Sequence, residues 1–279
     1  MMLDQDRRSL LLSALREAAR TDILPRFRAL GASQIQAKSG PADLVTVADR
    51  DAEARITAIL NRDWPEALVV GEEAVSADPS LLDRLDRAEW AVILDPVDGT
   101  WNFANGLSLF GMIAAVLFRG TVVWGALYDP LNDDWVEASD HGAEMVRGNG
   151  SRSPLAASKM TEPEQLNGYV PLGLFPKQIQ RRIAPLFPDY GRVTSLRCSC
   201  HEYRLMAQGR ADFCLSGPTP NVWDHAAGAL AVTRAGGVVR FLDGGGYDPL
   251  RRRGVLLAAG SEGLWSDLAA KFSFLAVAD

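Results

Sequence analysis

Two amphipathic helices are predicted in the first part of the chain from the spacing of apolar positions. The first is expected to end near Pro25 or Leu30. Its apolar face comprises Leu10, Leu11, Ala14, Leu15, Ala18 and Ala19. The second lies in AEARITAILNRDW, where Ile56, Ile59 and Leu60 share one face. The intervening KSGPADLVTVAD contains Gly and Pro, which predicts a loop or a short hairpin.

Short β-rich runs dominate the next part of the chain. ALVVG (67–71) and WAVIL (90–94) are each followed by acidic residues at a turn. FGMIAAVLF, TVVWGALYD, WVEAS and GAEMVRG then follow at hairpin spacing. This succession predicts an antiparallel meander.

The pattern changes after about residue 150, where helical and strand-like segments alternate. Helical periodicity occurs in LFPKQIQRRIAPLF, HEYRLMAQG, HAAGALAVTRAG and EGLWSDLAAKF. The strand candidates between them are RADFCLS, GVVRFL and GVLLAAG. Such alternation is typical of an α/β arrangement. We therefore predict two closely packed, layered lobes, an N-terminal α+β lobe (1–150) and a C-terminal α/β lobe (151–279).

Composition and charge limit the classes of partner. The chain has 279 residues, of which 47% are hydrophobic and 23% charged, so it has ample apolar material for a core. Its net charge of -6 and pI of about 5.2 argue against nucleic acid or an anionic membrane surface as the main partner. A small anionic substrate would need a cation to mediate its binding.

The cysteines and the N-terminal segment bear on the compartment. Cys198, Cys200 and Cys214 are odd in number and clustered, so no disulfide framework is expected and a reducing compartment fits best. MMLDQDRRSLLLSALREAAR has charged residues among its leucines, unlike a signal peptide. No apolar run reaches the length of a membrane span. The expected location is the cytoplasm.

The stretch ILDPVDGT places two aspartates three positions apart at the end of a predicted buried strand. The proline turn brings Asp95 and Asp98 toward one point, where two carboxylates repel each other unless a cation or proton lies between them. Oxygen ligands of this kind suit Mg²⁺, and the carbonyl of Val97 is placed to be a third. Gly99 lets the following amides, including that of Thr100, approach an anion closely.

A solvated turn is the alternative interpretation, because Asp, Pro and Gly are common in turns for reasons unrelated to function. Other strand and helix ends along the chain are also acidic. They carry Glu72 and Glu73 in GEEAV, Asp224 in VWDHAAG, and Asp43, Thr46 and Asp49 in DLVTVAD. Together with the Asp95 and Asp98 turn, these make four acidic strand or helix ends. This is more than helix caps and turns usually need, which favours a metal site.

The motifs GEEA, LDPVDGTWNFANG, YDPLNDDWVEAS and VWDHAAGALAVTRAGG together resemble the inositol monophosphatase family of magnesium-dependent, lithium-sensitive phosphatases. The resemblance extends from DLVTVAD to the WDHAAG segment and the strands after it. It implies an α-β-α-β-α sandwich of the sugar-phosphatase type, a homodimer, and two or three Mg²⁺ ions per active site. It also implies hydrolysis of a small phosphorylated metabolite by a metal-activated water.

The resemblance carries roles to individual residues of this chain. The implied metal ligands, the last of them supplied by the C-terminal lobe, are Glu72, Asp95, the Val97 carbonyl, Asp98 and Asp224. The implied residues that orient and activate the water are Thr100, Asp49 and Glu72. The phosphate would meet the backbone amides of Gly99 and Thr100, with Lys38 as a basic residue nearby.

The chain departs from the family pattern where relatives contact the leaving group. Relatives that use inositol carry a loop of small residues before a helix and a glutamate on the strand before WD. Here the loop reads SLRCSCHEY, and the strand, in ADFCLSGPTPNVWD, has no carboxylate near 214–216. Arg197 and His201 are therefore candidate substrate contacts, with exposure to solvent as the alternative. Histidinol phosphate and 3′-phosphonucleotides are alternative substrates, and a non-catalytic relative that binds metal or phosphate is the alternative class.

Overall fold

The computed structural model describes residues 2–40 and 43–276. Its helices are α1 (Gln5–Ala18), α2 (Val47–Asp63), α3 (Glu72–Ala77), α4 (Thr100–Ala104), α5 (Lys177–Ile183), α6 (Ser199–Ala207), α7 (Val222–Arg234) and α8 (Glu262–Lys271). The strands of its first half are β1 (Ile35–Gly40), β2 (Asp43–Thr46), β3 (Ala67–Gly71), β4 (Trp90–Asp98), β5 (Gly111–Phe118), β6 (Thr121–Asp129), β7 (Asp134–Ser139), β8 (Gly142–Arg147) and β9 (Arg152–Pro154). Those of its second half are β10 (Asn167–Tyr169), β11 (Arg192–Thr194), β12 (Phe213–Ser216), β13 (Val238–Phe241) and β14 (Leu256–Ala259).

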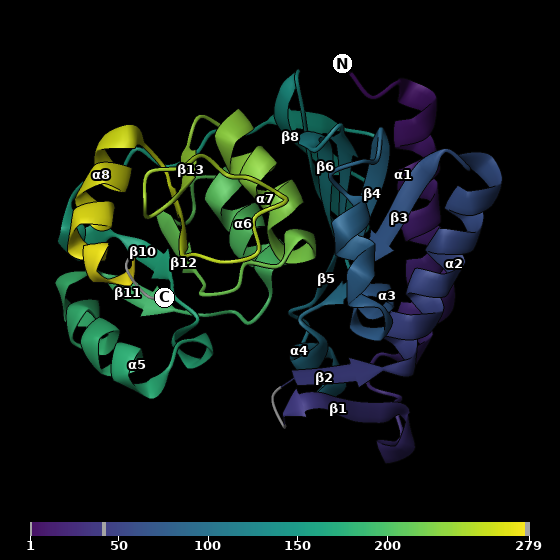
Figure 1. Ribbon diagram of the computed structural model, residues 1–279, viewed down its shortest axis with the longest axis horizontal. Helices are drawn as coiled ribbons and strands as arrows, with labels where there is room; N and C mark the ends of the chain where they lie inside the picture. Colours follow the sequence, from purple (N-terminus) through teal and green to yellow (C-terminus); the bar gives the residue numbers. More distant parts are fainter. Residues whose placement is uncertain (1, 41–42, 277–279) are drawn as a thin grey trace.

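Five layers of helices and sheets make up the molecule (Figure 1). The first sheet has seven strands in the order β3-β4-β5-β6-β7-β8-β9, and the second has five in the order β11-β10-β12-β14-β13. Helices α1 and α2 cover the outer face of the first sheet, α6 and α7 lie between the sheets, and α5 and α8 lie beyond the second. The predicted sandwich is confirmed.

The alternation of side chains along each strand explains this layering. On β4, Val92 and Leu94 pack with the α1 and α2 helices, whereas Ala91 and Ile93 face α7. Both faces of β4 are covered, so its apolar run is continuous and all nine residues are buried.

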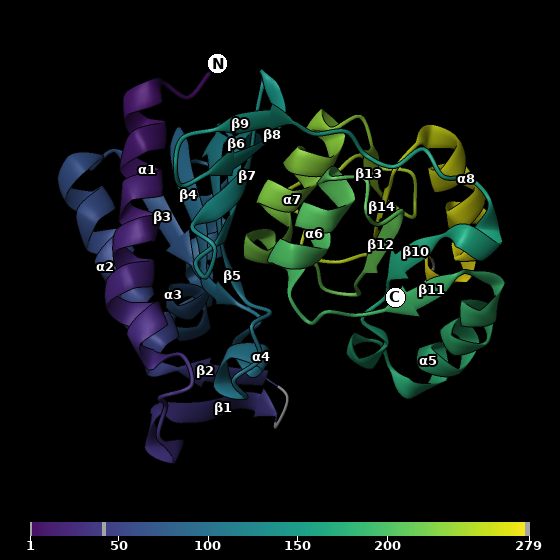
Figure 2. The ribbon, with the colours of Figure 1, turned by 180° about the vertical axis from the view of Figure 1, so that it is seen from behind.

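The elements expected from the sequence are largely present. Strands β5 to β8 form the predicted antiparallel meander. KSGPADLVTVAD covers the end of β1, all of β2 and the start of α2, so a hairpin is present there, and its connecting residues lie outside the described part of the chain. β9 pairs with β8 and therefore extends the first sheet past residue 150, before the chain crosses to the second sheet (Figure 2). The boundary between lobes remains a prediction. Among the residues described, no helix combines the length and apolarity that a bilayer crossing requires.

Candidate metal centre

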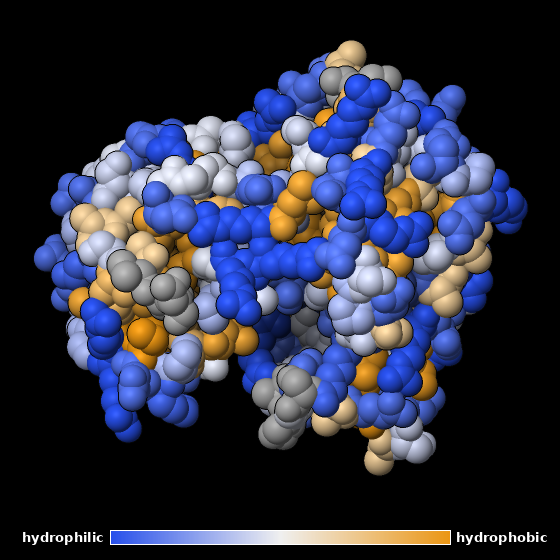
Figure 3. All heavy atoms as spheres, viewed as in Figure 1, coloured by the Kyte–Doolittle hydropathy of each residue, from blue (hydrophilic) through white to orange (hydrophobic). Residues whose placement is uncertain are grey.

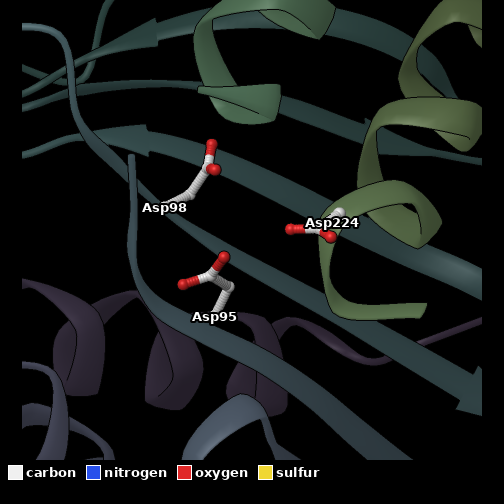
Figure 4. A group of neighbouring side chains, drawn as sticks. All are labelled: Asp95, Asp98 and Asp224. Atoms are coloured by element: carbon white, nitrogen blue, oxygen red, sulfur yellow. The ribbon is translucent and has the colours of Figure 1, made fainter. Parts of the chain in front are cut away.

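Three carboxylates converge between the two sheets. Asp95 and Asp98 come from the end of β4, and Asp224 comes from the first turn of α7. One oxygen of each lies within 4.8 Å of the others, and Figure 4 shows Asp224 pointing toward the two side chains on β4. Burial and the neighbouring carboxylates raise the pKa of Asp95 well above its usual value. Burial likewise raises the pKa of Asp224 to about 7.

The turn after β4 depends on glycine. Gly99 has φ of 86°, in the left-handed region, and an added Cβ would lie 2.8 Å from the backbone oxygen of Leu109. Asp95 Oδ1 accepts a hydrogen bond from the Val97 amide at 3.1 Å, which holds the two aspartates on one side of the turn. The local sequence therefore positions two of the three carboxylates, and Asp224 is brought to them by the second half of the chain.

The second half reaches Asp98 through the start of α6. The thiol of Cys198 lies 3.1 Å from Asp98 Oδ2, and the backbone amide of Cys200 donates to the same oxygen. Burial raises the pKa of Asp98, and these donors partly offset that rise. All three cysteines are buried and free.

A hydroxyl and a buried carboxylate lie beside the aspartates. Thr100 Oγ1 is 3.0 Å from Asp49 Oδ1 and 2.9 Å from the Val97 carbonyl. Asp49 Oδ2 accepts hydrogen bonds from the amide and hydroxyl of Thr46 at 2.9 and 2.6 Å, in a capping box at the start of α2. Burial raises the pKa of Asp49 to about 6. This carboxylate is therefore held in one orientation by the helix that carries it.

Glu72 lies at the start of α3 and is paired with a lysine. Lys38 Nζ is 2.7 Å from Glu72 Oε1 and 2.6 Å from Glu73 Oε1. Burial raises the pKa of Glu72 to about 8 despite the lysine. Glu72 lines the same cavity as the aspartates but is not one of the three carboxylates that lie within 4.8 Å of one another.

A cavity of about 540 Å³ contains these groups and opens at the hollow between the two halves of the molecule, visible in Figure 3. The predicted site residues on its lining are Glu72, Asp95, Val97, Asp98, Gly99, Thr100, Arg197 and Asp224. The guanidinium of Arg197 lies 4.0 Å from the ring centroid of Trp101, another lining residue.

Three predicted residues lie off the lining. Asp49 stands behind Thr100, and Lys38 stands behind Glu72. The His201 ring is turned toward the backbone, with Nε2 3.0 Å from the Phe110 carbonyl. The side chains of Arg197, just before α6, and His201, in its first turn, thus point in different directions.

Other lining residues were not among the predicted site residues, and those with polar or titratable side chains include Glu202, Ser216, Asn221 and His225. Asn221 Nδ2 donates to Asp224 Oδ2 at 3.0 Å, and burial raises the pKa of Glu202 to about 7. Burial lowers the pKa of His225 to about 4, so its imidazole is neutral. The position of His225 directly after Asp224 was the one sequence signal for it.

The residues present fit a divalent cation. Buried carboxylates that repel one another need protons or a cation, and no lysine or arginine of the described chain forms an ion pair with Asp95, Asp98 or Asp224. A donor set made of carboxylate oxygens suits Mg²⁺. Fold and site together define a layered α/β protein with an acidic cavity whose buried carboxylates fit a divalent cation.

The chain belongs to the inositol monophosphatase family, whose model matches residues 6–274. It is 28% identical to Nus factor SuhB of Pasteurella multocida over 212 residues, 73% of each chain. It is also 28% identical, over 211 residues, to the fructose-1,6-bisphosphatase/inositol-1-monophosphatase of Thermotoga maritima, covering 75% of this chain and 76% of that one.

Solved structures show the same fold. A Thermotoga maritima IMPase superimposes with a TM-score of 0.79 at 23% identity, covering 96% of both chains. At that identity the likeness supports the fold and not the substrate.

Proposed function

We propose that this protein is a Mg²⁺-dependent phosphomonoesterase that hydrolyses a small phosphorylated metabolite. The observation that carries the proposal is the pairing of Thr100 with Asp49 at 3.0 Å beside the cluster of Asp95, Asp98 and Asp224. Attack by water on a phosphate ester needs a cation to bind the water and the phosphate, and a hydroxyl and a base to orient the water. The carboxylate cluster, Thr100 and Asp49 can supply these roles.

The metal would be held by the three aspartates, Glu72 and the Val97 carbonyl, in two or three positions. Bound Mg²⁺ would lower the pKa of a water and offset the charge of the phosphate. Thr100 can accept a hydrogen bond from that water while donating its own proton to Asp49. The amides of Gly99 and Thr100 would bind the phosphate. Lys38 would add a positive charge near the phosphate and orient Glu72, with which it forms an ion pair.

A non-catalytic role is the second candidate. It is favoured by the relatives named Nus factor SuhB, which share the family with this chain. Against it stands the complete set of carboxylates and the intact pairing of Thr100 with Asp49, which a protein without catalysis has no need to keep. A test for hydrolysis separates the two candidates directly.

The decisive experiment measures phosphate release with and without metal. The Asp95→Asn variant is expected to lose activity, because a neutral amide cannot hold cations together. Wild-type activity that persists in a chelator-treated, metal-free sample would contradict the proposal. An exposed substitution such as Asp189→Asn, whose partner is the surface residue Lys271, is the matched control.

The substrate is proposed to be other than myo-inositol 1-phosphate. Ser216, a β12 residue on the lining, offers no carboxylate to accept hydrogen bonds from sugar hydroxyls, and Arg197 also lines the cavity. The Glu202 carboxylate on the lining already accepts from the Leu196 amide at 2.7 Å. Loss of such a buried partner discriminates by about 1–3 kcal/mol, or up to a few hundredfold in kcat/KM. The panel consists of inositol phosphates, histidinol phosphate, sugar phosphates, 3′-phosphonucleotides and glycerol phosphates. The highest kcat/KM for inositol 1-phosphate would refute this proposal.

Assembly and location complete the proposal. We propose a homodimer, as the family resemblance implies, in a reducing cytoplasmic environment. The three buried free thiols support the reducing environment.

A further inference from the structure

The wall of the cavity beside β12 contains a hydrogen-bond chain that includes no proposed metal ligand. It begins at Tyr203 on α6, passes through His225 on α7 and ends at Ser216 on β12. Tyr203 Oη lies 3.0 Å from His225 Nδ1, and His225 Nε2 lies 3.3 Å from Ser216 Oγ. Ser216 and His225 line the cavity, whereas Tyr203 is buried behind them.

The phenol of Tyr203 decides the direction of every hydrogen bond in this chain. It carries one proton, and His225 Nδ1 is the one partner that its hydroxyl has within the described part of the protein. Buried donors in folded proteins are paired, so Tyr203 donates and Nδ1 accepts. An imidazole whose Nδ1 accepts has no proton on that atom, so the ring proton is on Nε2, which donates to Ser216 Oγ.

The hydroxyl proton of Ser216 takes no part in the hydrogen bonds that link Tyr203, His225 and Ser216. Its oxygen accepts from His225, so its hydroxyl can donate to a ligand in the cavity. The opposite direction, in which Ser216 donates to Nε2 as a nucleophilic serine does, would leave the buried Tyr203 proton unpaired. The direction of these hydrogen bonds therefore argues against Ser216 as a nucleophile. It makes the Ser216 hydroxyl a hydrogen-bond donor to the cavity.

We infer that Ser216 is a specificity-determining residue that donates a hydrogen bond to the leaving alcohol, and that the site prefers alcohols with an acceptor atom there. An ether, carbonyl, carboxylate or second phosphate oxygen is such an acceptor. The inference rests on the proposed phosphomonoesterase activity.

Other groups on the lining can be compared with Ser216 as hydrogen-bond donors or acceptors. Arg197 carries donors only. The Glu202 carboxylate is engaged with its own loop, because Oε1 accepts from the Leu196 amide at 2.7 Å and the Ser195 hydroxyl at 3.2 Å. Its Oε2 lies 3.9 Å from the thiol of Cys214, so Glu202 remains a carboxylate on the lining. Near Ser216 the cavity therefore offers a ligand the donors of Ser216 and Arg197 beside a carboxylate that is already partly paired.

The test compares phosphate esters that differ by one atom. 2-Methoxyethyl phosphate and n-butyl phosphate have equal charge and similar length, and differ by an oxygen in place of a methylene. 3-Methoxypropyl and n-pentyl phosphate move that oxygen one atom farther from the phosphorus. 3-Aminopropyl phosphate carries a donor instead. The measured quantity is the ratio of kcat/KM for each ether to that for its alkyl partner, with Mg²⁺ present.

Ser216→Ala is expected to lower this ratio by about threefold to tenfold in at least one pair, the usual worth of one neutral hydrogen bond. Tyr203→Phe should lower it in the same pair, although Tyr203 does not reach the cavity, because the histidine proton is then free to move to Nδ1. The matched controls are Ser139→Ala and Tyr128→Phe, buried residues outside the cavity, which should keep the wild-type ratio.

Ratios that stay at the wild-type value in both variants and both pairs would overturn the inference. A wild-type preference for 3-aminopropyl phosphate that Ser216→Ala abolishes would overturn it too, because Ser216 would then be an acceptor. ¹⁵N NMR of the Mg²⁺-loaded protein reads the tautomer without any turnover. The chain has three histidines, so comparison with His225→Gln assigns the signal.

A proton on Nε2 supports the inference, and a proton on Nδ1 overturns it. Failure of the wild type to hydrolyse any ester would count against the proposed function alone, since the tautomer is measured separately.

Discussion

Glu53 accepts hydrogen bonds from backbone amides at the start of α3. Its replacement by glutamine should weaken metal binding at Glu72, although Glu53 does not line the cavity. The buried carboxylate accepts hydrogen bonds from the amides of Glu73 at 2.9 Å and Ala74 at 2.7 Å. These amides belong to the first turn of the helix whose first residue is Glu72. The orientation of a proposed metal ligand therefore depends on a residue of α2.

The magnitude follows from the two hydrogen bonds. A glutamine can accept from one amide, but its NH₂ group then faces the other donor, so at least one charge-assisted bond is lost, at about 1.5–3 kcal/mol. The melting temperature should fall by roughly 3–10 °C. If the first turn of α3 must re-form when the ion binds, the same free energy raises the half-saturating Mg²⁺ concentration by about 10- to 100-fold.

The assay combines calorimetry with Mg²⁺ titration of activity and of Mn²⁺ binding. Gly71→Ala attacks the same contact from the other side, because its Cβ would lie 2.2 Å from Glu53 Cδ, and it should reproduce the phenotype. Glu89→Gln, an exposed residue paired with Arg119, should change neither quantity. A lower melting temperature with wild-type Mg²⁺ dependence would show that Glu53 is structural only, and an unchanged melting temperature would refute the capping argument.

Three further outcomes are expected. Thr100→Ala should reduce kcat by about 10²–10⁴-fold with a smaller change in KM, and near-normal kcat would show that water activation runs through Glu72 or the metal alone. In chelator, the melting temperature should fall as the pH rises from about 4 to about 7. Burial raises the pKa of Asp49 to about 6 and that of Glu202 to about 7, so the folded protein binds more protons than the unfolded chain there. Mg²⁺ should flatten that slope because it displaces protons, and a melting temperature that rises with pH in chelator would contradict the assignment. Light scattering at micromolar concentration should give the mass of a dimer, and a mass near 30.2 kDa would contradict it.

The sequence alone determined the layered fold, the family and the position of the aspartates on β4. These features are local: an apolar run ends in a turn that glycine permits, and its two carboxylates lie three residues apart. Strands β10 and β11 escaped prediction because three residues are too few to show a period.

Tertiary structure decided which distant groups meet. The thiol of Cys198 contacts Asp98 across 100 positions of sequence, and His225 links Ser216 to Tyr203 by hydrogen bonds. The side chains of Arg197 and His201 diverge because one precedes α6 and the other belongs to it. Sequence spacing specifies neither sheet-to-sheet packing nor rotamer direction, and both are set by how the helices between the sheets fill the space available to them.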